Sequence, residues 1–167
     1  MKTEVDRIVE GLRLLPHPEG GYYRETYRSG ETLASPGLPS RFEGDRSIAT
    51  AIYYLLGPGD FSAFHRIRSD ETWHFYRGAG LRLYVLADDG VCECVLLGDG
   101  AERGEVFQAT VPAGRWFASE PATADGFALV GCTVSPGFDF RDFEMADAGV
   151  LLRDWPLHGD LIRRLCR

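Results

Sequence analysis

GDFSAFHRIRSDETWHFYRG, residues 59–78, is the stretch that decides the fold. Glycines flank a run that is apolar enough to form strand, and Arg68-Ser69-Asp70 supplies residues suited to a tight turn in its middle. The imidazoles of His65 and His74 and the carboxylate of Glu71 lie on either side of that turn. A cluster of this kind can hold a metal ion or move a proton.

The length of the turn decides which of these side chains share a face of the predicted hairpin. If Ser69 and Asp70 alone form the loop, His65 lies opposite His74. If Arg68 joins the loop, the alternation of side chains places His65 on the same face as Glu71. A bulge could bring all three site residues inward. The sequence alone leaves these registers open.

Composition and charge describe a globular protein without an electrostatic attraction to polyanions. The 167 residues are 44% apolar, long enough to bury a core within one domain spanning residues 1–167. The net charge of −7 disfavours nucleic acid and anionic membranes as partners. The first residues carry acids and lack a long apolar run, and no stretch is long enough to span a bilayer. We therefore expect a cytoplasmic protein.

The rest of the chain shows many short runs of β-branched and aromatic residues between turn signals, which predicts an all-β sandwich or closed barrel. A short helix capped by Thr3 precedes the strands, and helices are expected near residues 147–153 and 158–165. The predicted strands are Tyr22–Tyr27, Ser47–Leu56, Ser62–Ile67, Thr72–Tyr76, Leu81–Leu86, Cys92–Leu97, Phe107–Val111, Arg115–Ala118 and Phe127–Val134.

Residues 59–78 resemble the first motif of the cupin superfamily, in which a Gly, five residues, His-x-His, three residues, Glu, six residues and a Gly recur. Gly59, His65, Glu71 and Gly78 fall in register, and Ile67 replaces the second His. The segment PAGRWF, residues 112–117, resembles the second motif with an aromatic residue in place of its metal-binding His.

Three segments together resemble one single-domain cupin branch of unknown function: LPHPEGGYYRETYRS from residue 15, FHRIRSDETWHFYRG from residue 64, and PAGRWF. This resemblance implies a β-jelly-roll barrel with short peripheral helices at both ends, commonly assembled as a homodimer. It does not imply a reaction, because unrelated chemistries share this scaffold.

The candidate site residues follow from the predicted barrel. His65, Glu71 and His74 are the candidates for catalysis, because a carboxylate inside a barrel is costly unless it is paired, hydrogen-bonded or protonated. Arg24 or Glu25 could reach a ligand across the barrel mouth, where Arg suits a carboxylate or phosphate. The remaining candidates for ligand contact are Arg66 and the aromatic wall residues Trp73, Trp116 and Phe117.

Three hypotheses for function remain open. The first is a metal-independent, isomerase-like or epimerase-like enzyme acting on a small molecule, in which His65 is the acid or base and Glu71 orients it. The second is an oxygenase or isomerase in which His65, Glu71 and His74 hold a divalent transition metal. The third is a binding protein without catalysis. Because Ile67 and Phe117 replace two ligands, no cofactor is favoured.

Overall fold

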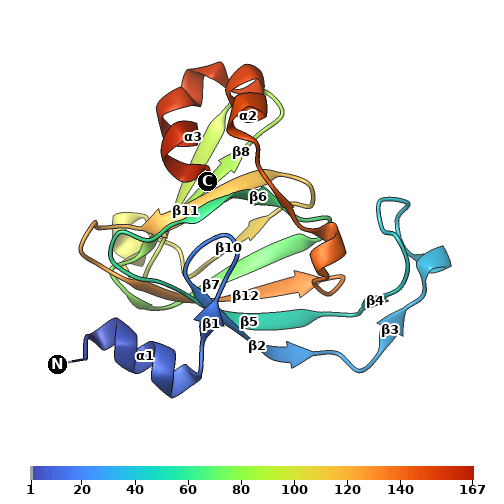
Figure 1. Ribbon diagram of the computed structural model, residues 1–167, viewed down its shortest axis with the longest axis horizontal. Coiled ribbons are helices and arrows are strands. Elements are labelled where there is room, and N and C mark those ends of the chain that lie inside the picture. Colours follow the sequence, from blue (N-terminus) through green and yellow to red (C-terminus); the bar gives the residue numbers. More distant parts are fainter. Residues whose placement is uncertain (1) are drawn as a thin grey trace.

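Two antiparallel sheets face one another in the computed structural model, which describes residues 2–167 (Figure 1). The domain predicted over residues 1–167 includes Met1, which lies outside the described residues. One sheet has the order β1 (Leu15–Pro16), β2 (Tyr22–Arg28), β5 (Thr50–Leu56), β12 (Ala128–Ser135), β7 (Asp70–Gly78) and β10 (Gln108–Val111). The other has the order β13 (Glu144–Met145), β6 (Ser62–Arg66), β11 (Trp116–Pro121), β8 (Leu81–Leu86) and β9 (Cys92–Leu97). The predicted all-β jelly roll is confirmed.

Each predicted strand forms, and the runs 81–86 and 92–97 match the prediction at both ends. The run predicted over Ser47–Leu56 is divided: β4 (Arg46–Ser47) pairs with β3 (Thr32–Leu33) in a separate two-stranded sheet, and β5 begins at Thr50. Short 3-10 helices punctuate the connections at Ser35–Gly37, Ala101–Arg103, Phe140–Asp142 and Pro156–His158.

The hairpin predicted around Arg68-Ser69-Asp70 is wrong. β6 and β7 lie in different sheets, so residues 67–69 cross from one layer to the other. His65 pairs with Phe117 on β11 and with Met145 on β13, whereas Glu71 pairs with strands of the opposite sheet. Neither predicted register therefore exists. His65 and Glu71 meet because each points inward from its own sheet.

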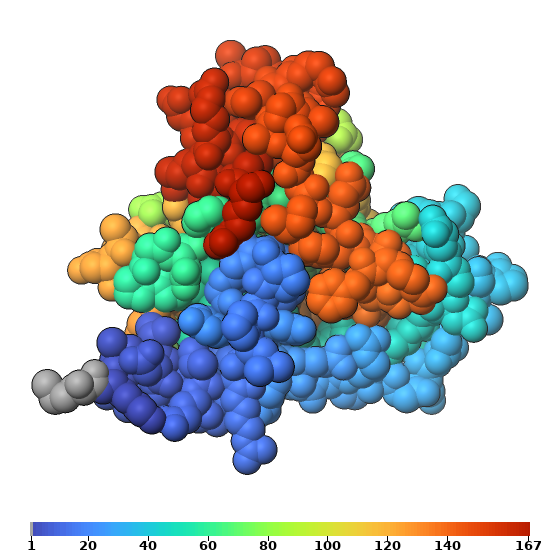
Figure 2. Space-filling view, in the orientation of Figure 1, coloured from blue at the N-terminus to red at the C-terminus, as the bar shows by residue number. Residues whose placement is uncertain are grey.

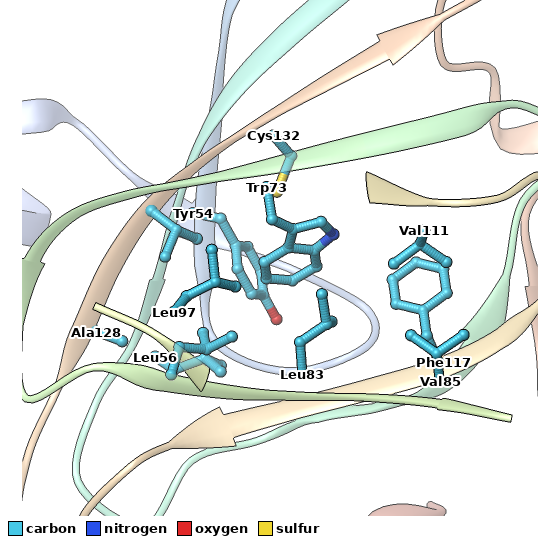
Figure 3. Close-up of a cluster of buried hydrophobic side chains, with 12 residues drawn as sticks. Tyr54, Leu56, Trp73, Leu83, Val85, Leu97, Val111, Phe117, Ala128 and Cys132 are labelled. Atoms are coloured by element: carbon cyan, nitrogen blue, oxygen red, sulfur yellow. The ribbon is translucent and has the colours of Figure 1, made fainter. Parts of the chain in front are cut away.

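Hydrocarbon fills much of the space between the sheets. Figure 3 shows Tyr54, Trp73 and Phe117 packed with aliphatic side chains from both layers. Tyr54 and Trp73 are each 1% exposed, and their ring centroids lie 5.7 Å apart in an edge-to-face arrangement. Burying such large side chains contributes roughly 1.5–3 kcal/mol each. This apolar cluster holds the two layers at a fixed separation.

Helices cover parts of the outer surface. α1 (Glu4–Leu12) begins at Thr3, whose side chain forms a reciprocal capping box with Asp6. α2 (Ala148–Asp154) and α3 (Gly159–Leu165) cover the outer face of the five-stranded sheet and form the lobe at the top of Figures 1 and 2. Within residues 2–167, no helix has both the length and the apolar character needed to cross a membrane.

This cover explains why β6 is buried on both faces. The side chain of Phe64 points outward and packs in one cluster with Leu151 and Ile162, while His65 points inward. The strand that carries the predicted imidazole is therefore shielded from water on its outer side.

Candidate functional site

The turn before β2 brings a carboxylate into the space between the sheets. Glu19 is followed by Gly20 and Gly21, which have φ angles of +118° and +68°. A Cβ on Gly20 would lie 2.1 Å from the Phe61 carbonyl oxygen, so only glycine allows the chain to pass this close to the strand edge. The Glu19 carbonyl accepts from the Ala63 N–H at 2.9 Å. These backbone contacts fix the Glu19 side chain beside β6.

Glu19 and His65 form a buried pair at the centre of the site. Glu19 Oε2 lies 3.0 Å from His65 Nε2, and the two residues are 5% and 2% exposed. The Ser62 hydroxyl donates to Glu19 Oε1 at 2.9 Å. His65 Nδ1 lies 2.7 Å from the carbonyl oxygen of Ala63. A carbonyl can only accept, so this contact places a proton on Nδ1.

The contact between the two side chains then requires a second proton. If His65 is neutral, Nε2 presents a lone pair, and Glu19 Oε2 must carry the proton that joins them. Burial raises the pKa of Glu19 and lowers the pKa of His65, because both charged forms lose their hydration. Both shifts favour the state in which the Glu19 carboxyl group donates to a neutral imidazole.

Glu71 brings a second carboxyl group to the same space from the opposite sheet. It is 8% exposed, and burial raises its pKa to about 8, because the charged form would lose its hydration. Glu71 therefore holds its proton at neutral pH. A neutral carboxylic acid in an apolar site can donate a hydrogen bond to a ligand oxygen.

His17 completes the polar part of the site. Its Nδ1 accepts from the Glu19 backbone N–H at 3.3 Å and lies 3.6 Å from Glu19 Oε2. Burial lowers the pKa of His17, and its ring packs edge-on against Tyr23 at a centroid distance of 4.6 Å. His17 therefore supports the Glu19 turn as a neutral group.

These side chains surround a small cavity. Its volume is about 40 Å³, and its walls include His17, Glu19, His65 and Glu71 together with aromatic and aliphatic side chains. Roughly 10–15 Å³ is enough to hold one water molecule, so only a small group fits beside the carboxyl groups without movement of the walls.

The predicted catalytic residues do not all meet here. His65 and Glu71 line the cavity, but His74 does not. His74 and Glu71 are three residues apart on β7 and so point to opposite faces of the strand. His74 Nε2 lies 3.1 Å from the Thr133 hydroxyl on the six-stranded sheet. The structure thus separates His74 from the two groups with which it was predicted to act.

The residues predicted to contact a ligand are also divided. Phe117 packs against the His65 ring at a centroid distance of 4.1 Å, and Trp73 lies deeper in the apolar core. Trp116 points to the outer face, where Arg66 lies over its ring at 4.3 Å. Placing Trp116 in the pocket wall was wrong, because adjacent residues of a strand face opposite ways.

Arg24 and Glu25 lie outside the central cavity. They line a groove along β2, in which Glu25 accepts two hydrogen bonds from Arg28 at 3.0 and 2.8 Å. The Arg24 guanidinium lies 5.9 Å from the centre of the Tyr53 ring. Neither side chain reaches across to His65 in this structure.

The donor set does not fit the metal centre that the first motif suggests. Ile67 lines the cavity and Phe117 covers His65, so hydrocarbon occupies both replaced positions. Both ring nitrogens of His65 already have partners. Among residues 2–167, no three His, Cys, Asp or Glu side chains are arranged to hold a metal ion. The combination of His65, Glu71 and His74 is therefore not a ligand set.

Sequence reasoning missed Glu19 and His17 as site residues. They lie 46 and 48 positions before His65, in a segment without strand periodicity. The available signal was an acid directly before two glycines, since a Gly-Gly pair permits close approach to another strand.

Comparison with known proteins agrees with this architecture. Residues 6–146 match the family model described as Cupin superfamily (DUF985). An uncharacterized protein of Saccharomyces cerevisiae is 33% identical over 151 residues, covering 84% of this chain and 74% of the yeast protein.

Two solved structures are similar along the whole chain. A hypothetical protein from Leishmania major shares 37% identity at a TM-score of 0.85, with 99% of each chain covered. A Shewanella oneidensis protein shares 40% identity at a TM-score of 0.86, covering 100% of this chain and 99% of that one. Oxalate decarboxylase from Bacillus subtilis, at 16% identity and a TM-score of 0.52 over 90% of this chain and 36% of its own, shares the fold alone. The chain therefore belongs to the DUF985 family of the cupin superfamily.

Proposed function

We propose that this cupin is an isomerase-like enzyme that moves a proton at a carbon atom beside a carbonyl group of a small molecule. The observation that carries the proposal is the 3.0 Å contact between Glu19 Oε2 and His65 Nε2, both buried and both at the wall of a cavity. A carboxyl group and an imidazole that share one proton form a reserve for acid–base chemistry.

The roles differ from those expected from the sequence. His65 was expected to act directly on the substrate, with Glu71 orienting it. Because both His65 nitrogens are engaged, Glu19 is the better group to meet the substrate, and His65 is its proton partner. Transfer of the Glu19 proton to Nε2 leaves a carboxylate next to an imidazolium, and this carboxylate is the base.

The proton and electron movements balance within the cavity. The Glu19 carboxylate takes the proton from carbon, the C–H electron pair forms the enolate, and the carbonyl oxygen accepts a hydrogen bond from protonated Glu71. Return of the proton to that carbon, on the same or the opposite face, restores the Glu19 carboxylate, and return of the imidazolium proton from His65 Nε2 to Glu19 regenerates the resting pair. Preorganised donors aimed at a developing oxyanion are among the largest contributions to catalysis.

Solvent exchange tests this proposal across a range of candidate substrates. A panel of small 2-oxo acids and hydroxycarbonyl compounds, each with and without a phosphate group, is incubated in D2O and followed by proton NMR. We expect the unaltered protein to catalyse loss of an α-proton signal. Glu19→Gln should slow this exchange by roughly 10²–10⁴-fold, the usual contribution of a positioned acid or base.

Variants at two histidines provide a matched control. His65→Asn should lose exchange as Glu19→Gln does, whereas His74→Asn, which alters the same residue type on the outer face of β7, should retain it. Exchange that survives Glu19→Gln, or no exchange with any member of the panel, would reject the proposal.

A further inference from the structure

A second, larger cavity lies next to the central one. Its volume is about 460 Å³, and four arginines line it: Arg41, Arg66, Arg68 and Arg141. This arginine cleft is unusual in a chain whose net charge is −7. Only two carboxylates, Asp142 and Glu144, belong to its walls.

The arginine cleft adjoins the cavity that holds Glu19. Ile67 and Phe143 line both spaces, so a single side-chain layer separates them. The inner space accepts only a small reacting group. A ligand larger than a few atoms that reaches Glu19 must extend outward, and the cleft is one direction in which it can do so.

The four arginines of the cleft differ in how strongly neighbouring carboxylates neutralise their charge. Arg66 pairs with Glu144 at 2.7 Å, and Arg141 forms two hydrogen bonds with Asp139 at 3.0 and 2.7 Å. Asp142 is committed to the buried Arg46. Arg41 has no such ion pair among residues 2–167, and Arg68 pairs only with carboxylates that are exposed or already bound to another arginine, so these two arginines carry the positive charge available to a ligand.

Arg41 and Arg68 are held in place by each other's backbone. Arg41 Nε donates to the Arg68 carbonyl and Arg68 Nη1 donates to the Arg41 carbonyl, both at 2.7 Å. Across residues 2–167, no carboxylate lies within 4.0 Å of the Arg41 guanidinium. Two carboxylates compete for Arg68: Glu43 contacts its Nη1 at 3.2 Å with a side chain that is 79% exposed, and Asp142 lies 3.9 Å from its Nε but is already bound to Arg46.

We propose that the arginine cleft binds the anionic end of the substrate, a phosphate or carboxylate group held by the guanidinium groups of Arg41 and Arg68. The inference rests on the proposed function, because it assigns the reacting end of the same molecule to Glu19. Guanidinium groups suit this task, since their planar N–H donors match the oxygens of both anions.

Calorimetric titration of the full chain at low ionic strength tests the cleft. Inorganic phosphate is the probe in one arm and malonate in the other, which distinguishes the two kinds of anion. We expect saturable binding of at least one, weakening as salt rises. Arg41→Gln and Arg68→Gln should each weaken that binding at least tenfold.

Two further variants keep the test independent of folding. Arg24→Gln removes an arginine of the β2 groove and should leave the affinity unchanged. Glu43→Gln removes the competing carboxylate from an exposed side chain and should increase the affinity severalfold. No saturable binding in either arm, or equal losses in Arg24→Gln and Arg41→Gln, would overturn the assignment.

The two proposals can fail separately. Glu19→Gln should bind the anion as the unaltered protein does while it loses α-proton exchange. If anions bind through Arg41 and Arg68 but no compound exchanges, the cleft stands and the reaction is rejected. If exchange occurs without anion binding, the cleft is rejected.

Discussion

Arg46–Asp142 and Glu19–His65 are two buried polar pairs that meet the cost of burial in opposite ways. Arg46 donates to both Asp142 oxygens at 2.7 Å, and its remaining nitrogen donates to three backbone carbonyls at 2.9–3.1 Å. Glu19 and His65 instead have one mutual contact at 3.0 Å and share one proton. Arg46 and Asp142 stay charged, because each guanidinium nitrogen has an acceptor. Glu19 and His65 are neutral, because burial disfavours both charged forms.

The difference separates a structural pair from the pair to which we assign the proposed reaction. The Arg46 bonds tie the chain around residues 43–46 to the 3-10 helix at 140–142 and leave no polar atom of the guanidinium open to a ligand. Glu19 and His65 line the central cavity, whereas Arg46 does not. The polar atoms of both pairs have partners, but only Glu19 and His65 also line that central cavity, and this marks them as a candidate site.

The largest expected effect is on the structural pair. Asp142→Ala should lower the free energy of unfolding by about 3–5 kcal/mol, because it leaves the Arg46 guanidinium buried without its carboxylate. Urea denaturation measures this loss. Glu144→Ala is the control, since its ion pair with Arg66 lies at the surface and the change should leave stability close to that of the unaltered protein. Similar losses of unfolding free energy in both variants would show that the buried pair stabilises the fold no more than a surface ion pair does.

The second prediction asks where the shared proton resides. Glu19→Ala should cost about 1–3 kcal/mol, because Ser62 and His65 lose a buried partner. Glu19→Gln should cost clearly less, because its amide can accept from Ser62 and donate to His65 Nε2 as a protonated carboxyl does. Thermal and urea unfolding of both variants measure the difference. Equal destabilisation by Gln and Ala would instead indicate an imidazolium paired with a carboxylate.

The third prediction concerns the pH dependence that Glu71 imposes. Its pKa is about 8 in the folded protein and near 4.5 in the unfolded chain, so between these values the folded form holds a proton that the unfolded form has lost. The free energy of unfolding should therefore fall as pH rises, by about 1.4 kcal/mol per pH unit from this group. Above the folded pKa the slope from Glu71 ends.

Glu71→Gln should flatten this part of the curve, because an amide does not titrate. Unfolding midpoints in urea at pH 5, 6, 7 and 8 provide the measurement, and the contribution of Glu19 is largely common to both proteins. Parallel curves for the variant and the unaltered chain would show that Glu71 is already ionised at neutral pH.

Local sequence patterns predicted the strands well and their partners poorly. Alternation and turn residues locate β8 and β9 to the residue, because both signals act over a few positions. The same signals made Arg68-Ser69-Asp70 look like a hairpin turn. A short connection that stays in one sheet and one that crosses between sheets use similar residues, and only the packing of the two layers distinguishes them.

The candidate site was predicted only in part, because local sequence patterns do not show which distant segments pack together. His65 and Glu71 belong to the segment that resembles the first cupin motif, and their shared inward direction is what that resemblance implies. Glu19 approaches through a loop that is distant in sequence, and its position depends on the path allowed by Gly20 and Gly21. Assembly as a homodimer, the absence of nucleic-acid and membrane partners, and a cytoplasmic location stay predictions.

The crossing at residues 67–69 has a consequence for how the site tolerates change. Five residues of covalent chain separate His65 from Glu71, although they belong to opposite layers. The Ile67 carbonyl accepts from Gly114 N–H at 2.8 Å, and the Ser69 hydroxyl donates to the Pro136 carbonyl at 2.7 Å. This short, hydrogen-bonded connection limits how far the His65 imidazole and the Glu71 carboxyl group can move apart, so a change of length in a distant surface loop should leave their spacing unchanged.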